Sequence, residues 1–137
     1  MVKKGRIFLV AIGLVLMVLA LTSCGRDQRV VLNVYNWGDY IDESVIDTFE
    51  KKYNIRVNYD TFSTNEDMYV KVKSGGAEYD LLFPSDYIIE RMIKEDMLHK
   101  LDFNNIPNYK YIQERFKNLA YDPQNEYSVP YMWGTVG

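Results

Sequence analysis

The sequence has very few of the residues from which catalytic and metal centres are usually built. Its 137 residues include one cysteine, Cys24, and one histidine, His99. A single cysteine cannot form an intramolecular disulfide, and no cluster of histidine, cysteine and aspartate has the spacing of metal ligands. The Gly-x-Ser-x-Gly motif of serine hydrolases is absent, and the paired glycines 75 and 76 follow a predicted helix instead of preceding one, as a phosphate loop would. These absences argue against an enzyme, a metal site or a bound cofactor.

The first segment must be set aside before the fold is considered. Residues 1–23 have the pattern of a bacterial lipoprotein signal, in which three basic residues precede an apolar run over 7–21 and two small residues then lead to Cys24. The apolar run is short for a membrane span, which needs about 20 apolar residues. We therefore predict a cleaved signal over 1–23, a lipid on Cys24 that anchors an exported chain to the membrane, and a tether over 24–29.

Basic residues are scarce in the part that follows the signal. Without the three basic residues of the signal, 13 of the 16 lysines and arginines remain against 19 acidic residues, which gives a net charge of about −6. Nucleic-acid binding depends on neutralising phosphates with Lys and Arg, so this charge argues against nucleic acid and is compatible with a cationic ligand. The twelve tyrosines suit a ligand cleft that is half apolar and half hydrogen-bonding.

Strand and helix patterns alternate from residue 30 onward. The β-branched run over 30–35 is typical of a parallel strand buried on both faces, and Asp42 is a good N-cap for a helix that ends near Tyr53 and has an apolar stripe. Residues 55–62 alternate between apolar and polar, as a strand does. The remaining predicted elements are a helix over 65–74 opened by a capping box of Thr64 and Asp67, a strand over 79–83, a helix after Pro84, strands over 98–101 and 127–131, and a helical turn over 111–117.

This order of elements predicts an α/β fold with a mostly parallel open sheet and flanking helices. Ligands bind such sheets beyond the carboxyl ends of the strands. The loops 36–40 and 84–87 both occupy that position, and we expect them to lie near one another on one rim.

The first of these loops has an unusual composition for a turn. It places the indole of Trp37, the carboxylate of Asp39 and the phenol of Tyr40 within four residues. An organic cation needs an aromatic face for its charge and methylenes, and an anion for its N–H donors. The second loop has Ser85, Asp86 and Tyr87, and Ser85 or Asp86 also suits a helix cap. Neither loop contains Arg or His, so an organic cation is favoured over an anion or an iron complex.

Four motifs give the chain a family resemblance. They occupy 36–40, 63–66, 79–85 and 128–134, in that order, and together they resemble the spermidine/putrescine-binding proteins of ABC uptake systems. The resemblance covers residues from about 31 to 137. It implies a periplasmic-binding-protein-like (type II) receptor in which two α/β lobes close on a linear polyamine and deliver it to an ABC permease.

The resemblance also implies which residues bind the ligand. Trp37, Asp39 and Tyr40 match ligand residues of the family, and so do Ser85 and Tyr87. In this assignment the aromatic rings pack on the methylene chain, Asp39 accepts hydrogen bonds from a terminal amine, and Ser85 adds a neutral acceptor. Two further positions are possible contacts: Gly38, where the family often has Ser or Thr, and Asp86.

Length is where the chain departs from the family, whose members are more than twice as long. We therefore expect 30–137 to be an incomplete first lobe with the second lobe absent, from a truncated or split reading frame, and to bind polyamines weakly by itself. Two alternatives stay open: a solute-binding lobe for another small cation or a metal complex, and a lipid-anchored sensor or docking module.

Overall fold

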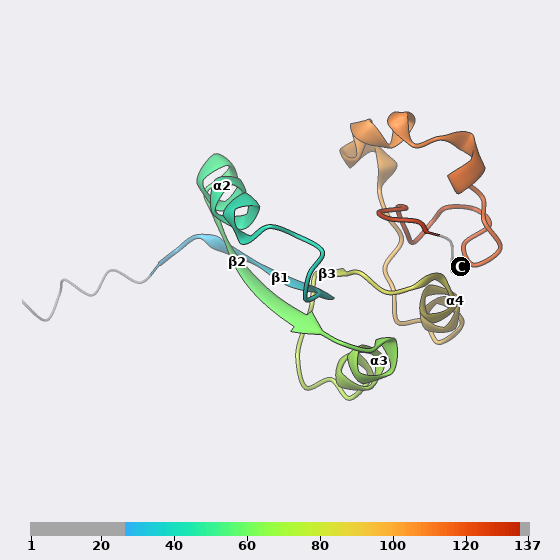
Figure 1. Ribbon diagram of the computed structural model, residues 1–137, viewed down its shortest axis with the longest axis horizontal. Helices are drawn as coiled ribbons and strands as arrows, with labels where there is room; N and C mark the ends of the chain where they lie inside the picture. The colour runs from blue at the N-terminus through green and yellow to red at the C-terminus, as the bar shows by residue number, and fades with distance from the viewer. Residues whose placement is uncertain (1–26, 135–137) are drawn as a thin grey trace, which may run out of the picture. The chain divides into compact units, whose positions relative to one another are not determined.

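The computed structural model describes residues 27–134 (Figure 1). The predicted signal over 1–23 and the lipidation site Cys24 lie outside the described residues. Residues 27–30 and 31–134 belong to two separate units of the chain. No helix within the described range combines the length and the apolar character needed to cross a membrane.

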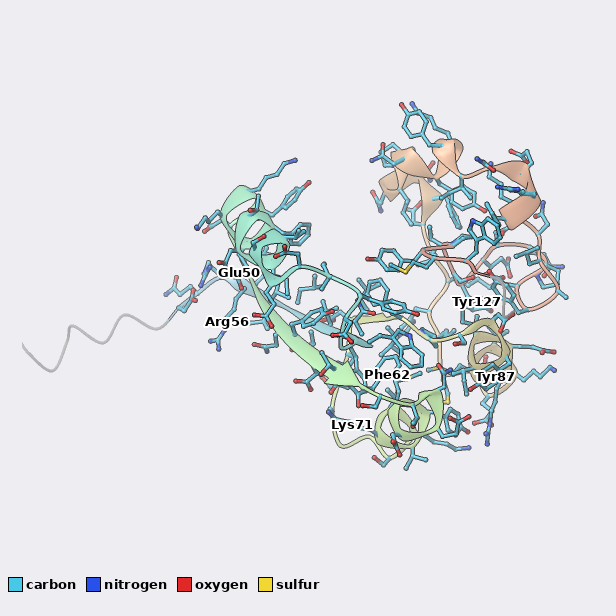
Figure 2. All side chains as sticks on the ribbon, viewed as in Figure 1. Glu50, Arg56, Phe62, Lys71, Tyr87 and Tyr127 are labelled. Atoms are coloured by element: carbon cyan, nitrogen blue, oxygen red, sulfur yellow. The ribbon has the colours of Figure 1, made fainter. Side chains whose placement is uncertain are left out.

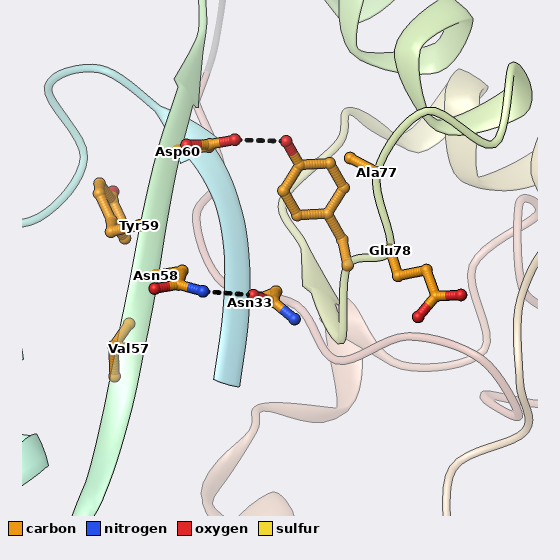
Figure 3. Close-up of a pocket in the computed structure, with 8 residues that line it drawn as sticks. Asn33, Val57, Asn58, Tyr59, Asp60, Ala77 and Glu78 are labelled. Carbon is orange, nitrogen blue, oxygen red and sulfur yellow. Dashed lines mark hydrogen bonds between the residues drawn. The ribbon is translucent and has the colours of Figure 1, made fainter. Parts of the chain in front are cut away.

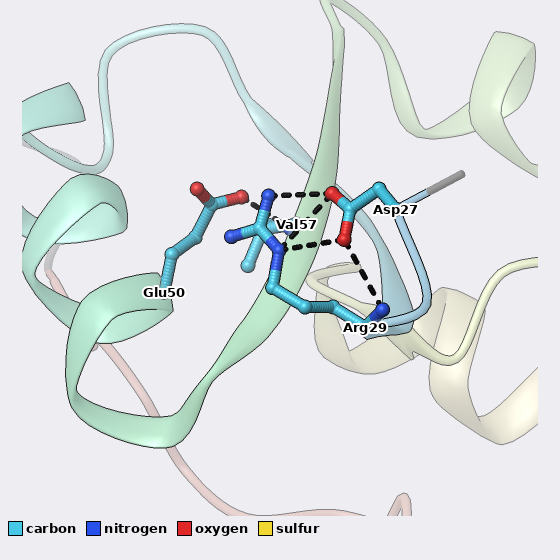
Figure 4. Close-up of polar contacts among 4 residues, drawn as sticks. All are labelled: Asp27, Arg29, Glu50 and Val57. Atoms are coloured by element: carbon cyan, nitrogen blue, oxygen red, sulfur yellow. Dashed lines mark hydrogen bonds and ion pairs between the residues drawn. The ribbon is translucent and has the colours of Figure 1, made fainter. Parts of the chain in front are cut away.

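Each unit has a local polar contact of its own, and Figure 4 shows both. In the first unit, the Arg29 guanidinium donates to both carboxylate oxygens of Asp27, from Nη2 to Oδ2 at 2.7 Å and from Nε to Oδ1 at 3.0 Å. In the second unit, the Glu50 carboxylate accepts the backbone N–H of Val57 at 2.6 Å. The second contact joins a helix to the strand that follows it.

The larger unit is built on a three-stranded sheet. Helices connect consecutive strands and lie on opposite sides of them (Figure 1), as right-handed crossovers require. The predicted α/β fold with a parallel sheet is confirmed. The strands lie in the order β2-β1-β3, with bounds Val30–Trp37 for β1, Ile55–Phe62 for β2 and Leu81–Leu82 for β3.

The third strand is shorter than the predicted 79–83. It runs parallel to β1, with Tyr35 opposite Leu82. The neighbouring residues still donate to β1, since the backbone N–H of Asp80 lies 2.9 Å from one β1 carbonyl oxygen and that of Phe83 lies 3.1 Å from another. The pairing therefore extends slightly beyond the strand itself.

The first helix, α2 (Glu43–Tyr53), begins and ends at the predicted residues. The Asp42 carboxylate accepts a backbone N–H of the first turn, and Asn54 ends the helix in the left-handed conformation, with a φ of 51°. No residue of α2 is buried. Val45 and Phe49 of the predicted apolar stripe are 50% and 40% exposed. The stripe is only half covered because α2 packs on β2, a strand at the edge of the sheet.

The next two helices hold the core of this unit. The predicted capping box opens α3 (Asn65–Lys73): the Asp67 N–H donates to Thr64 Oγ1 at 3.1 Å, and Thr64 Oγ1 donates to the Asp67 carboxylate at 2.7 Å. The helix α4 (Asp86–Lys94) follows β3. The core cluster of this unit draws on the sheet and on both helices, and its buried members are Tyr35, Phe62, Met68, Tyr69, Ile88 and Met92.

No strand follows α4 in the part of the chain that the structure describes. The strands predicted over 98–101 and 127–131 are therefore wrong, and the helical turn predicted over 111–117 is present only in part. Three short 3-10 helices occupy this region instead, at Phe103–Asn105, Pro107–Tyr111 and Glu114–Phe116.

Asp122 explains why the last predicted strand does not form. It is 3% exposed, and its carboxylate accepts the backbone N–H groups of Glu126, Tyr127 and Ser128 at 2.9–3.0 Å, together with the Ser128 hydroxyl at 2.8 Å. These N–H groups would otherwise pair with a neighbouring strand. The buried Asp122 carboxylate is therefore the acceptor for these N–H groups, in place of a neighbouring strand.

Glu95, directly after α4, provides a pH-dependent link between α3 and α4. Its carboxylate accepts hydrogen bonds from Lys73 at 2.7 Å, Tyr69 at 2.5 Å and Arg91 at 3.1 Å. These bonds, that of Lys73 above all, lower the pKa of Glu95 to about 2 from an ordinary value of 4.5.

A carboxylate with a lowered pKa stabilises the fold above its unfolded pKa and loses that contribution as the pH falls toward the folded value. We expect Glu95→Gln to lower the free energy of unfolding at neutral pH, and the difference from wild type to shrink as the pH falls from 4.5 toward 2. Urea denaturation across this range measures it. A difference in the free energy of unfolding that stays the same at every pH would contradict this role of the Glu95 carboxylate.

Candidate functional site

The candidate site begins where β1 ends. Asn36 is fully buried, and its Oδ1 accepts the backbone N–H of Trp37 at 2.7 Å. The Trp37 indole N–H donates to the carbonyl oxygen of Phe83 at 2.8 Å. This second bond joins the loop after β1 to the segment directly before Pro84. The two rim segments, 36–40 and 84–87, are therefore held together at Trp37.

Aromatic rings surround the Trp37 side chain. Its indole packs against Phe62 with ring centroids 4.6 Å apart and lies 5.8 Å from the ring of Tyr40. Trp37 is half-buried, and Tyr40 is 39% exposed. The indole is thus fixed on one side by the core while an aromatic surface remains accessible beside it.

Tyr131 extends this aromatic surface, although it was not among the predicted site residues. Its hydroxyl donates to the Tyr40 carbonyl oxygen at 3.1 Å, and its ring lies 6.5 Å from Tyr40 and 5.0 Å from Phe83. The only sequence signal for Tyr131 was its place in the motif over 128–134. It is 53% exposed.

Asp39 and Gly38 lie on the exposed part of the first loop. The Asp39 carboxylate makes no hydrogen bond or ion pair with any other residue in the range 27–134. A Cβ atom on Gly38 would meet nothing within 4 Å, so a hydroxyl-bearing side chain would fit there. The carboxylate of Asp39 is therefore available to a ligand.

Ser85 occupies the N-cap position of α4 with an extended backbone, but its side chain makes no capping bond. Its hydroxyl instead accepts from Asn65 Nδ2 at 2.9 Å. The neighbouring Asp86 carboxylate accepts the N–H of Tyr87 at 2.7 Å and lies in the first helical turn, where an anion is favourable. The predicted capping role thus applies to Ser85 only through its backbone, and its hydroxyl keeps one lone pair for a ligand.

Tyr87 is 50% exposed on the first turn of α4, and Figure 2 shows where it lies. Its hydroxyl donates to Glu66 Oε1 at 3.0 Å. Partial burial, followed by this hydrogen bond, raises the pKa of Tyr87. Glu66 is the second residue that sequence reasoning did not assign to the site, although it ends the motif over 63–66.

Two buried polar groups lie behind the first loop. The Asn36 Nδ2 and the Tyr59 hydroxyl are inaccessible, and neither has a partner within hydrogen-bond geometry among the described residues. Burial raises the pKa of Tyr59, and the nearby Asn36 amide partly offsets that effect.

A separate hollow of about 620 Å³ runs along β1 and β2 and contains none of the predicted ligand residues (Figure 3). Its polar groups are largely paired with each other. Asn58 Nδ2 donates to Asn33 Oδ1 at 2.8 Å, and the Asp60 carboxylate accepts from Tyr79 and Lys71. The hydrogen bond from Tyr79, more than that from Lys71, lowers the pKa of Asp60. An anion already neutralised in this way is a poorer cation acceptor than Asp39.

The chain resembles proteins that bind polyamines. It is 37% identical over 120 residues to the spermidine/putrescine-binding periplasmic protein of Escherichia coli K12, covering 86% of this chain and 34% of that protein. Among solved structures it is similar to the spermidine/putrescine ABC transporter substrate-binding protein PotD of Streptococcus pneumoniae, with 45% identity, a TM-score of 0.75 and coverage of 77% and 32%. The PotD lipoprotein Tp0655 of Treponema pallidum is 44% identical, with a TM-score of 0.70 and coverage of 74% and 32%.

The chain spans about a third of the length of these relatives. One family profile, described as hypothetical lipoprotein (MG045 family), matches residues 1–123, which is most of the chain. The α/β fold and the order of the sequence motifs are both consistent with this family match. The chain belongs to the MG045 lipoprotein family, and its fold is similar to those of the solved polyamine-transporter proteins.

Proposed function

We propose that this chain binds a polyamine of the spermidine/putrescine class as the receptor component of an ABC-type uptake system. The observation that carries the proposal is the pairing of Asp39 with Trp37. Asp39 is an exposed carboxylate with no partner among the described residues, and it follows two residues after an indole that is fixed by the Phe83 carbonyl. The names of the relatives support the choice of ligand.

The chemistry of a polyamine suits these groups. Its ammonium groups carry several N–H donors each, and the Asp39 carboxylate offers charge-assisted acceptors for them. Its methylene chain is apolar and carries partial positive charge near each nitrogen, so Trp37 and Tyr40 provide both contact area and cation–π attraction. Ser85 and Tyr87 add a neutral acceptor and a further ring. The proposed role is binding without chemical conversion.

Calorimetric titration of the chain with putrescine and spermidine tests this proposal. Butane-1,4-diol is a matched control because it has the four-carbon chain of putrescine without the charges. We expect saturable heat from both amines and none from the diol. Binding of the diol as well as the amines would indicate a merely apolar site, and an absence of heat with millimolar amine would refute the proposal.

We also propose that Cys24 carries a lipid that anchors the exported chain, with 1–23 as the signal and 24–29 as the tether before the lobe over 30–137. The sequence pattern and the lipoprotein family support this assignment. We expect metabolic labelling with radioactive palmitate to mark the wild-type chain and to fail with Cys24→Ser. Equal labelling of the wild-type chain and of Cys24→Ser would contradict lipidation at Cys24.

A further inference from the structure

The first turn of α3 contacts the two candidate ligand residues of α4. Asn65 is 6% exposed, and its Oδ1 accepts the backbone N–H of Ser85 at 3.0 Å while its Nδ2 donates to Ser85 Oγ at 2.9 Å. A backbone N–H can only donate, so the oxygen of the Asn65 amide must face it. The amide nitrogen then necessarily faces the hydroxyl. Both the backbone and the side chain of Ser85 are held by one buried residue.

Glu66, the next residue, holds the other candidate. Its Oε1 accepts the Tyr87 hydroxyl proton at 3.0 Å, and the side chain is exposed. No Lys or Arg within residues 27–134 forms an ion pair with Glu66, although several other carboxylates of this unit are paired, including Asp60 and Glu95. Its second oxygen has no protein partner in the same range. The carboxylate keeps both its charge and acceptor capacity.

Asp86 adds to the negative field at this place. It lies directly before Tyr87 on α4, and its charge acts on the Tyr87 hydroxyl together with that of Glu66. One oxygen of the Asp86 carboxylate accepts a backbone N–H of its own helix, whereas Glu66 contacts the Tyr87 hydroxyl directly. Glu66 is therefore the better placed of the two to accept hydrogen bonds from a cation near that hydroxyl.

We propose that Glu66 is a further ligand-binding residue, whose carboxylate is shared between the Tyr87 hydroxyl and an ammonium group of the polyamine. This inference rests on the proposed function. A polyamine has more than one ammonium group, and Asp39 on the first loop and Glu66 on α3 each provide a carboxylate acceptor for such a group. The proposed site thus has one carboxylate on the loop 36–40 and another on α3.

Glu66→Gln tests the proposal because the amide keeps an acceptor for the Tyr87 hydroxyl while the charge is removed. Asp47→Asn is the matched control, since it removes one negative charge from an exposed position of α2. We expect Glu66→Gln to weaken spermidine binding about threefold, the size of an exposed charge pair, and Asp47→Asn to leave it unchanged. We also expect the pKa of Tyr87, followed by its carbon-13 ζ shift without ligand, to fall in Glu66→Gln alone.

The two readouts separate this inference from the proposed function. A wild-type chain that binds no spermidine would refute the proposed function itself. A wild-type chain that binds spermidine no better than Glu66→Gln does would leave that function intact and overturn the role of Glu66 in the ligand site. An unchanged Tyr87 pKa in Glu66→Gln would overturn the contact between Glu66 and Tyr87.

Discussion

Replacing Trp37 by alanine is expected to weaken spermidine binding by at least about tenfold, or about 1.4 kcal/mol. A cation–π contact with a partly desolvated Trp is worth about 0.5–2 kcal/mol, and the substitution also removes apolar contact with the methylene chain. The loss has a second source. The indole N–H holds the first loop to the Phe83 carbonyl at 2.8 Å, so alanine also releases Asp39 and Tyr40 from their position.

Two variants separate these effects. Trp37→Phe keeps an aromatic face but has no N–H for the Phe83 carbonyl, so we expect an intermediate affinity. Trp133→Ala removes an indole that is 65% exposed and packs against Phe116 with centroids 5.4 Å apart, and we expect little change. Dissociation constants from calorimetry, with urea midpoints as a check of folding, measure the series. Equal affinities for wild type and Trp37→Ala would refute the role of the indole.

The largest loss of stability is expected from Asp122→Ala, at about 3 kcal/mol. The substitution leaves three backbone N–H groups and the Ser128 hydroxyl without their acceptor. Each buried donor left unsatisfied costs about 1–3 kcal/mol, and water entering the loop recovers part of the sum. Because Asp122 shapes the segment that leads to Tyr131, the ring contact between Tyr131 and Tyr40 should also be lost.

Asp102→Ala is the matched control for Asp122. Asp102 also accepts hydrogen bonds from the residues that follow it, including the Asn104 N–H at 3.0 Å, but it is exposed. We expect its replacement to cost about 1 kcal/mol or less, as for a typical cap. Urea denaturation of both variants gives the comparison. A cost for Asp122→Ala as small as that for Asp102→Ala would show that burial of the carboxylate does not matter.

Local signals predicted the first half of the fold well. The residues that begin α2 and α3 act through contacts within a few positions, so Asp42 and Thr64 could be identified from their neighbours alone. The alternation over 55–62 gave β2 with its bounds unchanged. In each case the sequence pattern and the tertiary structure agree, which is the usual condition for a successful prediction.

The two predicted strands that do not form both lie beyond α4, where side chains compete with the sheet for backbone groups. The segment 127–131 has the composition of a strand, yet Asp122 binds its first N–H groups. Leu101 donates to the Glu126 carbonyl at 2.7 Å, and this single bond replaces the ladder predicted for 98–101. A pattern of apolar residues shows that a segment is partly buried. The pattern does not show which acceptors will bind the backbone N–H groups of that segment.

Residues of the candidate site could be predicted where they were unsuited to their local structure, or where the loop position and the family resemblance indicated them, as for Ser85 and Tyr87. Trp37 and Asp39 stood out because a turn has no need for an indole beside a carboxylate. Asn65 and Glu66 looked like ordinary residues at the start of a helix, and their contacts with Ser85 and Tyr87 join positions 20 and 21 residues apart. Only the packing of α3 against α4 reveals them.

The most direct test of the proposed site is a nitrogen-15 NMR titration of the chain with spermidine, which detects even millimolar binding, or about −4 kcal/mol. We predict saturable shifts of the Trp37 indole N–H and of the backbone signals of Asp39, Tyr40, Ser85 and Tyr87. Asp39→Asn should reduce them. Shifts confined to the hollow around Asn33, Asn58 and Asp60, or no shifts at all, would contradict a polyamine site on this rim.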